Sequence, residues 1–314
     1  MPSTSEIARA GMAGQSLSGR QRFVLAFSRL WAWIFLLLMI VFFAVAVPIF
    51  SGGASFFTVR NSQNILVAIT PILLLALGQT FVIISAGIDL SVGWVMSLAS
   101  VLSAHAIRAS FNAGIPLPLA VAAGLAAAVA GAAMVGLVNG TIIAKLKVPA
   151  FIVTLGTSFI VRGVALLLSE NTVVIGLPEG IRDYGNEALV YSIRGEEGGI
   201  YFLAPPEELS SQMLRQMDRI LPWPVIFTAF IVALCVFLLR KTQFGRHTDA
   251  IGGNIEAALR AGIPVDRRII QIYMLSAVTA GIAGFLSTLR FTAGSAVIGD
   301  PLLLSSIAAV TKVH

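Results

Sequence analysis

The sequence predicts an all-α fold, a polytopic bundle of helices that crosses a membrane. Hydrophobic residues make up 57% of the 314-residue chain and charged residues only 11%, whereas a soluble domain carries about 25% charged residues. The apolar residues also gather in segments of about 20 residues, the length at which a helix spans the ~30 Å hydrocarbon core. Such segments are expected to be helices because unpaired backbone groups are costly in lipid.

The first segment is a basic tail followed by a long apolar run. Residues 1–30 are polar and carry four arginines, and the apolar run covers 31–50. A cleavable signal peptide has a core of about 7–15 apolar residues, so this longer run is expected to remain as the first span. Pro48 lies at its far end, where a helix can stop at low cost.

Six more apolar segments follow, and a seventh, 302–310, is too short to span. The run 120–136 is almost entirely Ala, Gly and Val, so its helix is expected to pack closely against protein. We therefore expect one transmembrane domain over residues 31–310, with at least seven spans and a partial C-terminal segment. The six segments lie at about 65–86, 91–107, 117–140, 150–169, 223–240 and 269–290.

Charge placement predicts the orientation. With a cytoplasmic N-terminus, the inner segments are 1–30, 87–90, 141–149 and 241–268, and they hold or border 12 of the 21 basic residues. The outer loop 170–222 holds 9 of the 15 acidic residues and only four arginines. Cytoplasmic loops are enriched in Lys and Arg. The net charge of +6 is therefore a topology feature, and nucleic acid is not an expected partner.

The loop 170–222 is long for a connection within a bundle. It carries a Pro-Pro pair, an acidic run and a possible amphipathic helix around 207–220. Two interpretations remain open: a periplasmic element that meets an external partner, and a poorly ordered insertion.

The segment 78–93 is the first candidate site. Asp89 lies between two spans and is flanked by Gly87 and Gly93. Ionisable residues at membrane depth are costly and usually functional, and glycines permit a broken or sharply turned backbone. Asp89 is also expected to cap the next helix through the Ser91 and Val92 amides, and the two roles are compatible. The predicted translocation path comprises Gln79, Thr80, Gly87, Asp89, Ser91, Gly93, Asn139, Thr154 and Thr157.

The segment 245–264 is the second candidate site. It joins two spans, is mostly polar, and contains a predicted short helix over 254–260 with Asn254 as its cap and Gly262 as its stop. A short helix on the inner face can serve as a docking knob for a soluble partner. A plain connecting loop is the alternative.

Four segments in order resemble the permease subunits of ribose-type ABC importers, which handle monosaccharides and related solutes. They are GIDLSVG at 87–93, VNGTIIAKLKVPAFIVTLGTSFIVRG at 138–163, FGRHTDAIGGNIEAALRAGI at 244–263 and SSIAAV at 305–310. Within the third, Glu256-Ala257-Ala258 followed by Gly262 resembles the EAA-x-x-x-G loop of many importer permeases.

The resemblance implies a dimer of this permease with a second copy or a homologue in the bacterial inner (plasma) membrane. It also implies two ATP-binding subunits that dock on the loop 241–268, a periplasmic solute-binding protein and surrounding membrane lipid. The implied docking residues are Gly245, Arg246, Gly252, Gly253, Asn254, Glu256, Ala257, Ala258 and Gly262.

The chain itself lacks the sequence motifs of nucleotide, metal and catalytic sites. It has no G-x-x-x-x-G-K-[ST] segment, so if transport is driven by ATP, the ATP is bound and hydrolysed by a separate subunit, and no cofactor is expected on this chain. Cys235 is the single cysteine, and no G-x-S-x-G or H-E-x-x-H pattern occurs. Arg162, inside a span, is expected near the inner half of its helix, held by carbonyls or an acidic residue. We expect a transport protein and not an enzyme.

The resemblance implies a sugar or polyol as the solute, and the polar but uncharged groups of the spans support a neutral one. The alternative is an ion-coupled secondary transporter in which Asp89 is a proton or sodium site. Residues 311–314 depart from the family pattern, which continues through a Gly-rich segment and further spans. The resemblance therefore suggests a truncated C-terminus.

Overall fold

A computed structural model describes residues 19–53, 55–193, 199–203 and 217–311. The chain falls into two units, residues 1–62 and 63–314, and each is described by itself.

The first unit is dominated by one long helix. Helix α2 covers Gly19–Phe50 and contains Pro48 in its last turn. Its apolar window Trp33–Phe50 has a mean hydropathy of 2.9, and no residue of that window is buried by its own unit. An uncovered apolar surface of this length is typical of a helix in contact with lipid. The predicted first span therefore lies inside α2.

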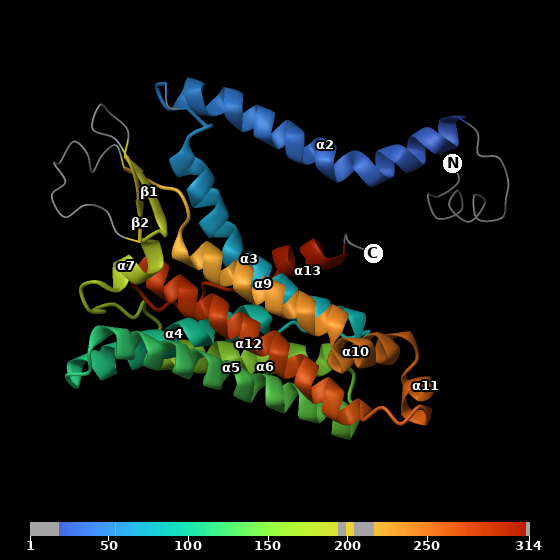
Figure 1. Ribbon diagram of the computed structural model, residues 1–314. Helices are drawn as coiled ribbons and strands as arrows, with labels where there is room; N and C mark the ends of the chain where they lie inside the picture. The colour runs from blue at the N-terminus through green and yellow to red at the C-terminus, as the bar shows by residue number, and fades with distance from the viewer. Residues whose placement is uncertain (1–18, 54, 194–198, 204–216, 312–314) are drawn as a thin grey trace. The chain divides into compact units, whose positions relative to one another are not determined.

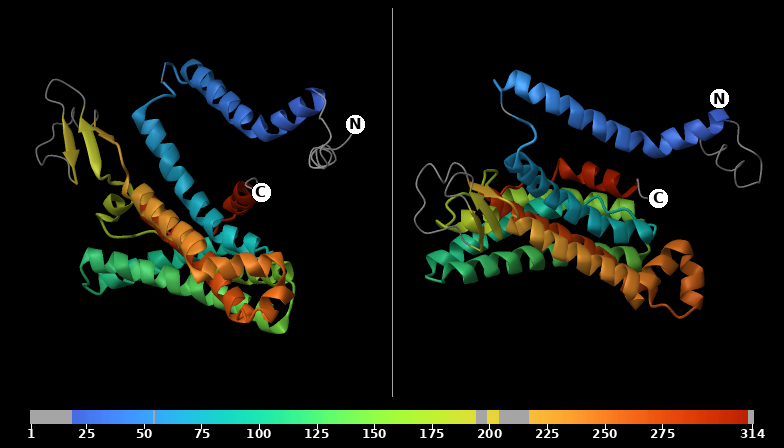
Figure 2. Two further views of the ribbon diagram at one scale, coloured as in Figure 1. Left: turned by 45° about the vertical axis from the view of Figure 1, so that its right-hand side comes forward. Right: turned by 45° about the horizontal axis from the view of Figure 1, so that its top comes forward.

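Six further helices are long and apolar enough to cross a membrane, which gives seven among the described residues (Figures 1 and 2). The predicted helical bundle with seven spans is confirmed. The helices extend past several predicted ends, as at 141–146, because polar residues near a helix end still pair their backbone groups within the helix. They are α3 (Val59–Ile84), α4 (Val92–Asn112), α5 (Leu117–Leu146), α6 (Ala150–Leu168), α9 (Trp223–Lys241) and α12 (Val265–Phe291).

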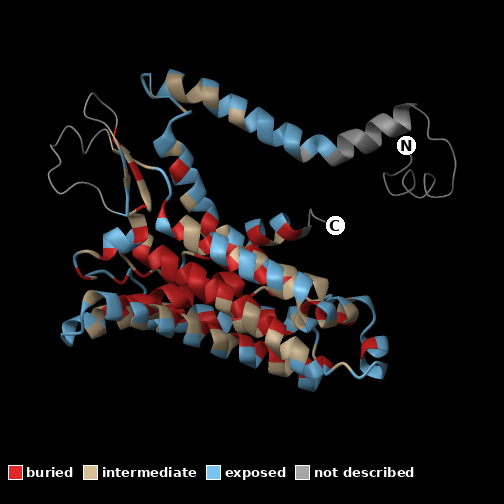
Figure 3. Ribbon diagram, in the orientation of Figure 1, coloured by how far each residue is buried: buried red, intermediate tan, exposed pale blue. Residues whose placement is uncertain are grey.

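The centre of the second unit is formed by α4 and α12. Buried residues make up 72% of the α4 span window and 67% of the α12 window, against 28% for α6 and 17% for α9 (Figure 3). The mean hydropathy is lower in the more buried helices: it is 1.2 for α4 and 1.8 for α12, but 2.0 for α6 and 2.2 for α9. Helices that face lipid need apolar side chains, whereas enclosed helices can carry serine and threonine that bond within the protein.

Small residues bring these helices close together. A Cβ added to Gly136 of α5 would lie 2.6 Å from the Tyr273 carbonyl oxygen of α12, and one added to Gly140 would lie 2.7 Å from the Ile270 Cα. At Gly284, α12 meets the Met96 carbonyl of α4 closely. Small side chains at helix crossings permit this backbone approach, as the sequence of α5 predicts.

One end of the unit carries a small sheet. After helix α7 (Ile181–Asn186), strands β1 (Val190–Ile193), β2 (Ile200–Phe202) and β3 (Met217–Arg219) form an antiparallel sheet in the order β2-β1-β3. We call this the sheet end. The predicted helix around 207–220 lies mostly outside the described residues, and its last part is wrong because 217–219 form a strand.

The opposite ends of α9 and α12 are joined by helices α10 (Gln243–Gly253) and α11 (Ile255–Arg260), which we call the knob (Figure 1). The prediction included α11 but missed α10. After α12, the chain continues through 292–301 into α13 (Leu302–Thr311), whose ten residues are too short to span, as predicted.

Candidate functional site

The segment between α3 and α4, residues 85–91, is the first candidate site, and we call it the link. Helix α3 closes with the Ala86 amide bonded to the Ile83 carbonyl and the Gly87 amide bonded to the Val82 carbonyl, 2.9 Å each. This pairing is a Schellman motif, in which the residue after the helix adopts left-handed φ. Here that residue is Ala86, with φ of 59°.

Gly87 of the link and Gly93 in the first turn of α4 have a different role from the one predicted. Neither Gly87 nor Gly93 has positive φ. A Cβ on Gly87 would lie 2.5 Å from the Tyr273 hydroxyl, and one on Gly93 would lie 2.7 Å from the Gly299 carbonyl oxygen. Glycine is therefore needed at these positions for close approach of other segments and not for a left-handed turn.

Asp89 is only 1% exposed and accepts three hydrogen bonds. Its Oδ1 accepts from the Ser91 amide at 2.9 Å and the Ser91 hydroxyl at 2.6 Å. Its Oδ2 accepts from the Ser276 hydroxyl of α12 at 3.0 Å. The predicted bond from the Ser91 amide is present, but Ser91 is itself the N-cap of α4 and no side chain caps that helix, so the prediction that Asp89 caps it is wrong. No cation pairs with this carboxylate among the described residues, so the hydroxyls and the amide provide its solvation.

Side chains from four helices hold the link. Gln79 of α3 donates to the Asp89 carbonyl, and Asn139 of α5 donates to the Ser91 hydroxyl at 3.0 Å. Thr154 of α6 accepts from the Leu90 amide at 3.1 Å. Together with Ser276, these bonds join the link to α3, α5, α6 and α12, so a change in the packing of any of these helices must act on it.

Three buried polar atoms near Asp89 lack partners in the described structure: Gln79 Oε1, Asn139 Oδ1 and the Tyr273 hydroxyl. All three residues are at most 2% exposed. These atoms therefore leave hydrogen-bonding capacity beside Asp89 that no group among the described residues uses.

The link lies within the depth of the bundle. Ser276 is 11 residues beyond Val265, the first residue of α12, which places it roughly 16 Å along the helix axis. A second segment, 292–301, runs back along α4 from the sheet end. Its Ser295 amide bonds to the Ser100 hydroxyl at 3.1 Å, and its Gly299 amide bonds to the Ser97 hydroxyl at 2.9 Å.

Two non-helical segments therefore meet at the start of α4, one from each end of the bundle. Non-helical backbone at membrane depth occurs where protein encloses it or where it lines a cavity. The sequence analysis missed 292–301, although its glycines and Pro301 carry a signal for broken helical structure.

Six of the predicted path residues are buried together around the link, whereas Thr80, Thr157 and Gly87, itself a residue of the link, are only partly buried. Thr80 donates to the Ala76 carbonyl of its own helix at 2.8 Å, and Thr157 is half-buried on α6. Gly87 is half-buried against Tyr273, which lies on α12. Sequence spacing missed Tyr273 and Ser276, because neither lies in a recognisable motif. The six are Gln79, Asp89, Ser91, Gly93, Asn139 and Thr154, all buried.

Arg162 differs from its prediction. It lies 12 residues after the start of α6 and six before its end, with its guanidinium 4.8 Å from the centre of the Trp94 ring. A cation over an indole face is an attractive arrangement, most of all where water is scarce. An aromatic ring of α4 therefore takes the place of the expected carbonyl or acidic partner.

The knob is the second candidate site. Asn254 caps α11 by accepting from the Ala257 amide at 2.9 Å. The helix closes with another Schellman motif, in which Gly262 has φ of 78° and its amide bonds to the Leu259 carbonyl at 3.0 Å. Ala258 is 3% exposed and packs with Ile251 and Val265, which fixes α11 on the bundle.

The outer face of α11 combines apolar and charged side chains. Ile255 is 46% exposed and Leu259 is 55% exposed. Beside them, Arg260 and Glu256 form an exposed ion pair with 3.7 Å between Nη2 and Oε2. The sequence analysis missed both apolar residues, although their i, i+4 spacing places them side by side on one face of the short helix.

The predicted docking residues divide into an exposed group and a supporting group. Gly245 is buried against the Leu239 carbonyl, Gly252 lies against the Ile84 carbonyl, and Ala258 is buried. These three shape the knob and do not present a surface. The exposed group is Arg246, Gly253, Asn254, Glu256, Ala257 and Gly262.

The knob touches the start of the link. Gly252 of α10 meets the Ile84 carbonyl, one residue before the link begins, and the Phe244 ring lies 5.8 Å from the Phe81 ring of α3. The two candidate sites are therefore one connected structure, in which a displacement of α10 must shift the end of α3.

Comparison with known proteins identifies the family. Residues 61–311 match the family model described as the permease component of the branched-chain amino acid transport system. The xylose transport system permease protein XylH of Haemophilus influenzae is 33% identical, over 87% of this chain and 80% of the relative. The L-arabinose transport system permease protein AraH of Escherichia coli is 35% identical, over 92% and 77%.

The ribose import permease protein RbsC of Escherichia coli is 29% identical, over 95% of this chain and 81% of the relative. No solved structure matches. The chain belongs to this family of permease components, which are membrane-embedded transport subunits and not enzymes.

Proposed function

We propose that this chain is the permease subunit of an ATP-driven importer for a monosaccharide or related polyol in the bacterial inner membrane. Relatives named for xylose, L-arabinose and ribose support the solute class. The knob supports ATP as the energy source. It presents an exposed helix with apolar and charged side chains and an Asn254 cap, and the chain has no P-loop of its own, so a separate ATPase is expected to dock there.

In this proposal two ATPase subunits bind the knobs of two permeases, and a periplasmic solute-binding protein meets the sheet end. The charge distribution supports this orientation, with a cytoplasmic N-terminus. Basic residues gather at the knob end, among them Lys145, Lys147, Arg240 and Lys241, and acidic residues gather around α7.

ATP binding would shift the permease between two conformations by binding one more tightly than the other. The proposed route runs from the knob through Gly252 to the end of α3 and then to the link. The buried bonds at Asp89 then exchange partners, with the unpaired atoms of Gln79, Asn139 and Tyr273 available as new partners. In this proposal Gln79, Asp89, Ser91, Gly93, Asn139 and Thr154, the six buried residues of the predicted path, act through this network.

The test uses charge reversal on α11. Glu256→Lys, Arg260→Glu and the double swap Glu256→Lys/Arg260→Glu are compared by co-purification with a co-expressed ABC-type ATPase subunit from the same organism and by ATP-driven uptake in proteoliposomes. The swap restores the ion pair, so it repairs a defect that is only internal to α11. We expect both single variants and the swap to lose ATPase binding at least tenfold, the size of effect that follows when two interfacial charges are mismatched.

An unchanged ATPase affinity in all three variants would refute docking at the knob. The alternative function, an ion-coupled secondary transporter, has one observation in its favour: Asp89 is buried without a cationic partner among the described residues. Uptake driven by a proton or sodium gradient, without ATPase, would support that alternative.

A further inference from the structure

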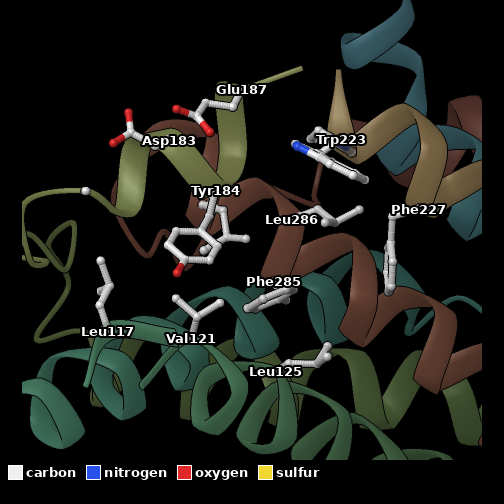
Figure 4. Close-up of a pocket in the computed structure, with 13 residues that line it drawn as sticks. Leu117, Val121, Leu125, Asp183, Tyr184, Glu187, Trp223, Phe227, Phe285 and Leu286 are labelled. Atoms are coloured by element: carbon white, nitrogen blue, oxygen red, sulfur yellow. The ribbon is translucent and has the colours of Figure 1, made fainter. Parts of the chain in front are cut away.

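A cavity of about 740 Å³ lies at the sheet end of the second unit (Figure 4). Its walls come from the first turns of α5 and α9, the last turns of α12, and α7. These are the ends of three predicted spans, so the cavity lies where the hydrocarbon core gives way to the headgroup region. Its volume is within the range of small-molecule sites.

The lower part of the cavity is apolar. Leu117, Val121 and Leu125 recur at intervals of four on one face of α5, and Phe285 of α12 and Phe227 of α9 face them. This wall extends over about two helical turns and offers no side-chain hydrogen-bonding group. A hydroxyl-rich solute needs several convergent polar groups, whereas an acyl chain needs only an apolar wall of this kind.

The upper part is polar and aromatic. Tyr184 is 40% exposed and Trp223 is 38% exposed, so the cavity opens to its surroundings between them. Rings with a polar tip are typical of the membrane boundary. Asp183 and Glu187, four residues apart, place their carboxylates above the rings (Figure 4).

These two carboxylates have no ion-pair partner among the described residues. The nearby Arg219 donates instead to the Asn186 carbonyl at 2.8 Å. Two acidic groups above an apolar wall favour a ligand with a cationic head and repel an anionic one. A primary ammonium fits best, because it can donate three hydrogen bonds to carboxylates and a quaternary ammonium can donate none.

We propose that this cavity binds a phospholipid with a primary amine headgroup, such as phosphatidylethanolamine. One acyl chain lies along α5 beside Phe285, and the ammonium lies beside Asp183 and Glu187. That the lipid comes from the outer leaflet rests on the orientation proposed above. The binding site itself does not depend on the transported solute or on an ATPase.

The experiment uses Trp223 as a reporter. The purified full chain is placed in phosphatidylcholine nanodiscs that contain equal fractions of dibromo-acyl phosphatidylethanolamine, phosphatidylglycerol or phosphatidylcholine. The fluorescence of a Trp223→Phe variant is subtracted to isolate Trp223 from the other three tryptophans. We expect the ethanolamine lipid to quench Trp223 with roughly three- to tenfold higher apparent affinity than the glycerol lipid, as one or two partly exposed ion pairs would give.

Two variants separate the parts of the proposal. Asp183→Asn/Glu187→Gln should reduce the affinity for the ethanolamine lipid to that of phosphatidylcholine. Val121→Phe should fill the cavity and lower quenching by all three lipids, while Leu167→Phe, 79% exposed on α6, should change nothing. Equal quenching by the three lipids in the unmodified chain would overturn the headgroup assignment.

If an added monosaccharide protects Trp223 from quenching and the three lipids quench it equally, the cavity is a solute site and the lipid proposal is overturned. A failure of ATP-driven uptake leaves this result unchanged, because quenching is measured without ATPase, binding protein or solute. The two proposals therefore fail independently.

Discussion

The link and the knob are both short, polar connections between spans, yet one is enclosed and the other is exposed. Asp89 of the link is 1% exposed and bonded to two helices, whereas Glu256 of the knob has a side chain that is 78% exposed. The difference teaches that similar polar composition serves two purposes in this protein. Enclosed polar groups hold helices together, and exposed polar groups are available to a partner.

A large loss of stability is expected from a side chain added in the first turn of α4, directly after the link. Gly93→Val places its Cβ 2.7 Å from the Gly299 carbonyl oxygen, where neither backbone can move away cheaply. Overpacking of this kind costs about 1–3 kcal/mol and sometimes more, so we expect a large loss of folded protein in detergent by fluorescence-detected size exclusion and thermal unfolding.

The matched change on the knob is Gly253→Val, where no atom lies within 4 Å of an added Cβ. Its thermal midpoint should stay close to that of the unmodified protein. If both variants unfold alike, the contrast between enclosed and exposed connections is wrong.

A second effect comes from the carboxylate of the link. Asp89→Ala removes the acceptor of three hydrogen bonds and leaves the donors of Ser91 and Ser276 buried without a partner. Each unsatisfied group costs about 1–3 kcal/mol, so we expect a loss of several kcal/mol, measured by chemical unfolding in detergent.

Asp89→Asn retains one acceptor oxygen and should recover much of that loss. Glu256→Ala on the knob should change the stability by less than about 0.5 kcal/mol, as is usual for exposed sites. Equal stability of the Ala and Asn variants of Asp89 would contradict the hydrogen-bond account.

The contrast also explains which features of the structure could be predicted from the sequence alone. Span number and the α11 helix follow from hydropathy, the Asn254 cap and the Gly262 stop, which are local signals. The partners of Asp89 do not, because Ser276 is 187 residues away and carries no motif. Likewise Gly93 was read as a turn residue, since its contact with Gly299 depends on the return of 292–301 into the bundle.

The sheet was missed for a similar reason. Its strands have three or four residues each, too short for an alternating pattern to be recognised, and β3 lies in a segment with helical composition. Strand pairing is a tertiary feature that overrides such local preference.

A third, smaller effect concerns the cap of the knob. Asn254→Ala removes the bond to the Ala257 amide and should fray α11 at a cost of about 1 kcal/mol. Because α11 is exposed, we expect global stability to change little while co-purification of the ATPase falls several-fold. Asn254→Asp keeps an acceptor and serves as the control. A normal yield of ATPase with Asn254→Ala would show that an intact α11 is not needed for docking.

The smallest effect compares the two Schellman motifs directly. Helix α3 ends with Ala86 at φ of 59°, and α11 ends with Gly262 at φ of 78°. Left-handed φ costs a residue with a Cβ about 1 kcal/mol more than glycine, so Ala86→Gly should stabilise the protein by about 0.5–1 kcal/mol. Gly262→Ala should destabilise α11 by a similar amount. Chemical unfolding reports the first change, and hydrogen exchange of the 255–263 amides reports the second. Opposite signs are required, because the backbone geometry is the same at both helix ends and only the residue differs; a loss of stability with Ala86→Gly would mean that the alanine methyl contributes packing that outweighs its strain.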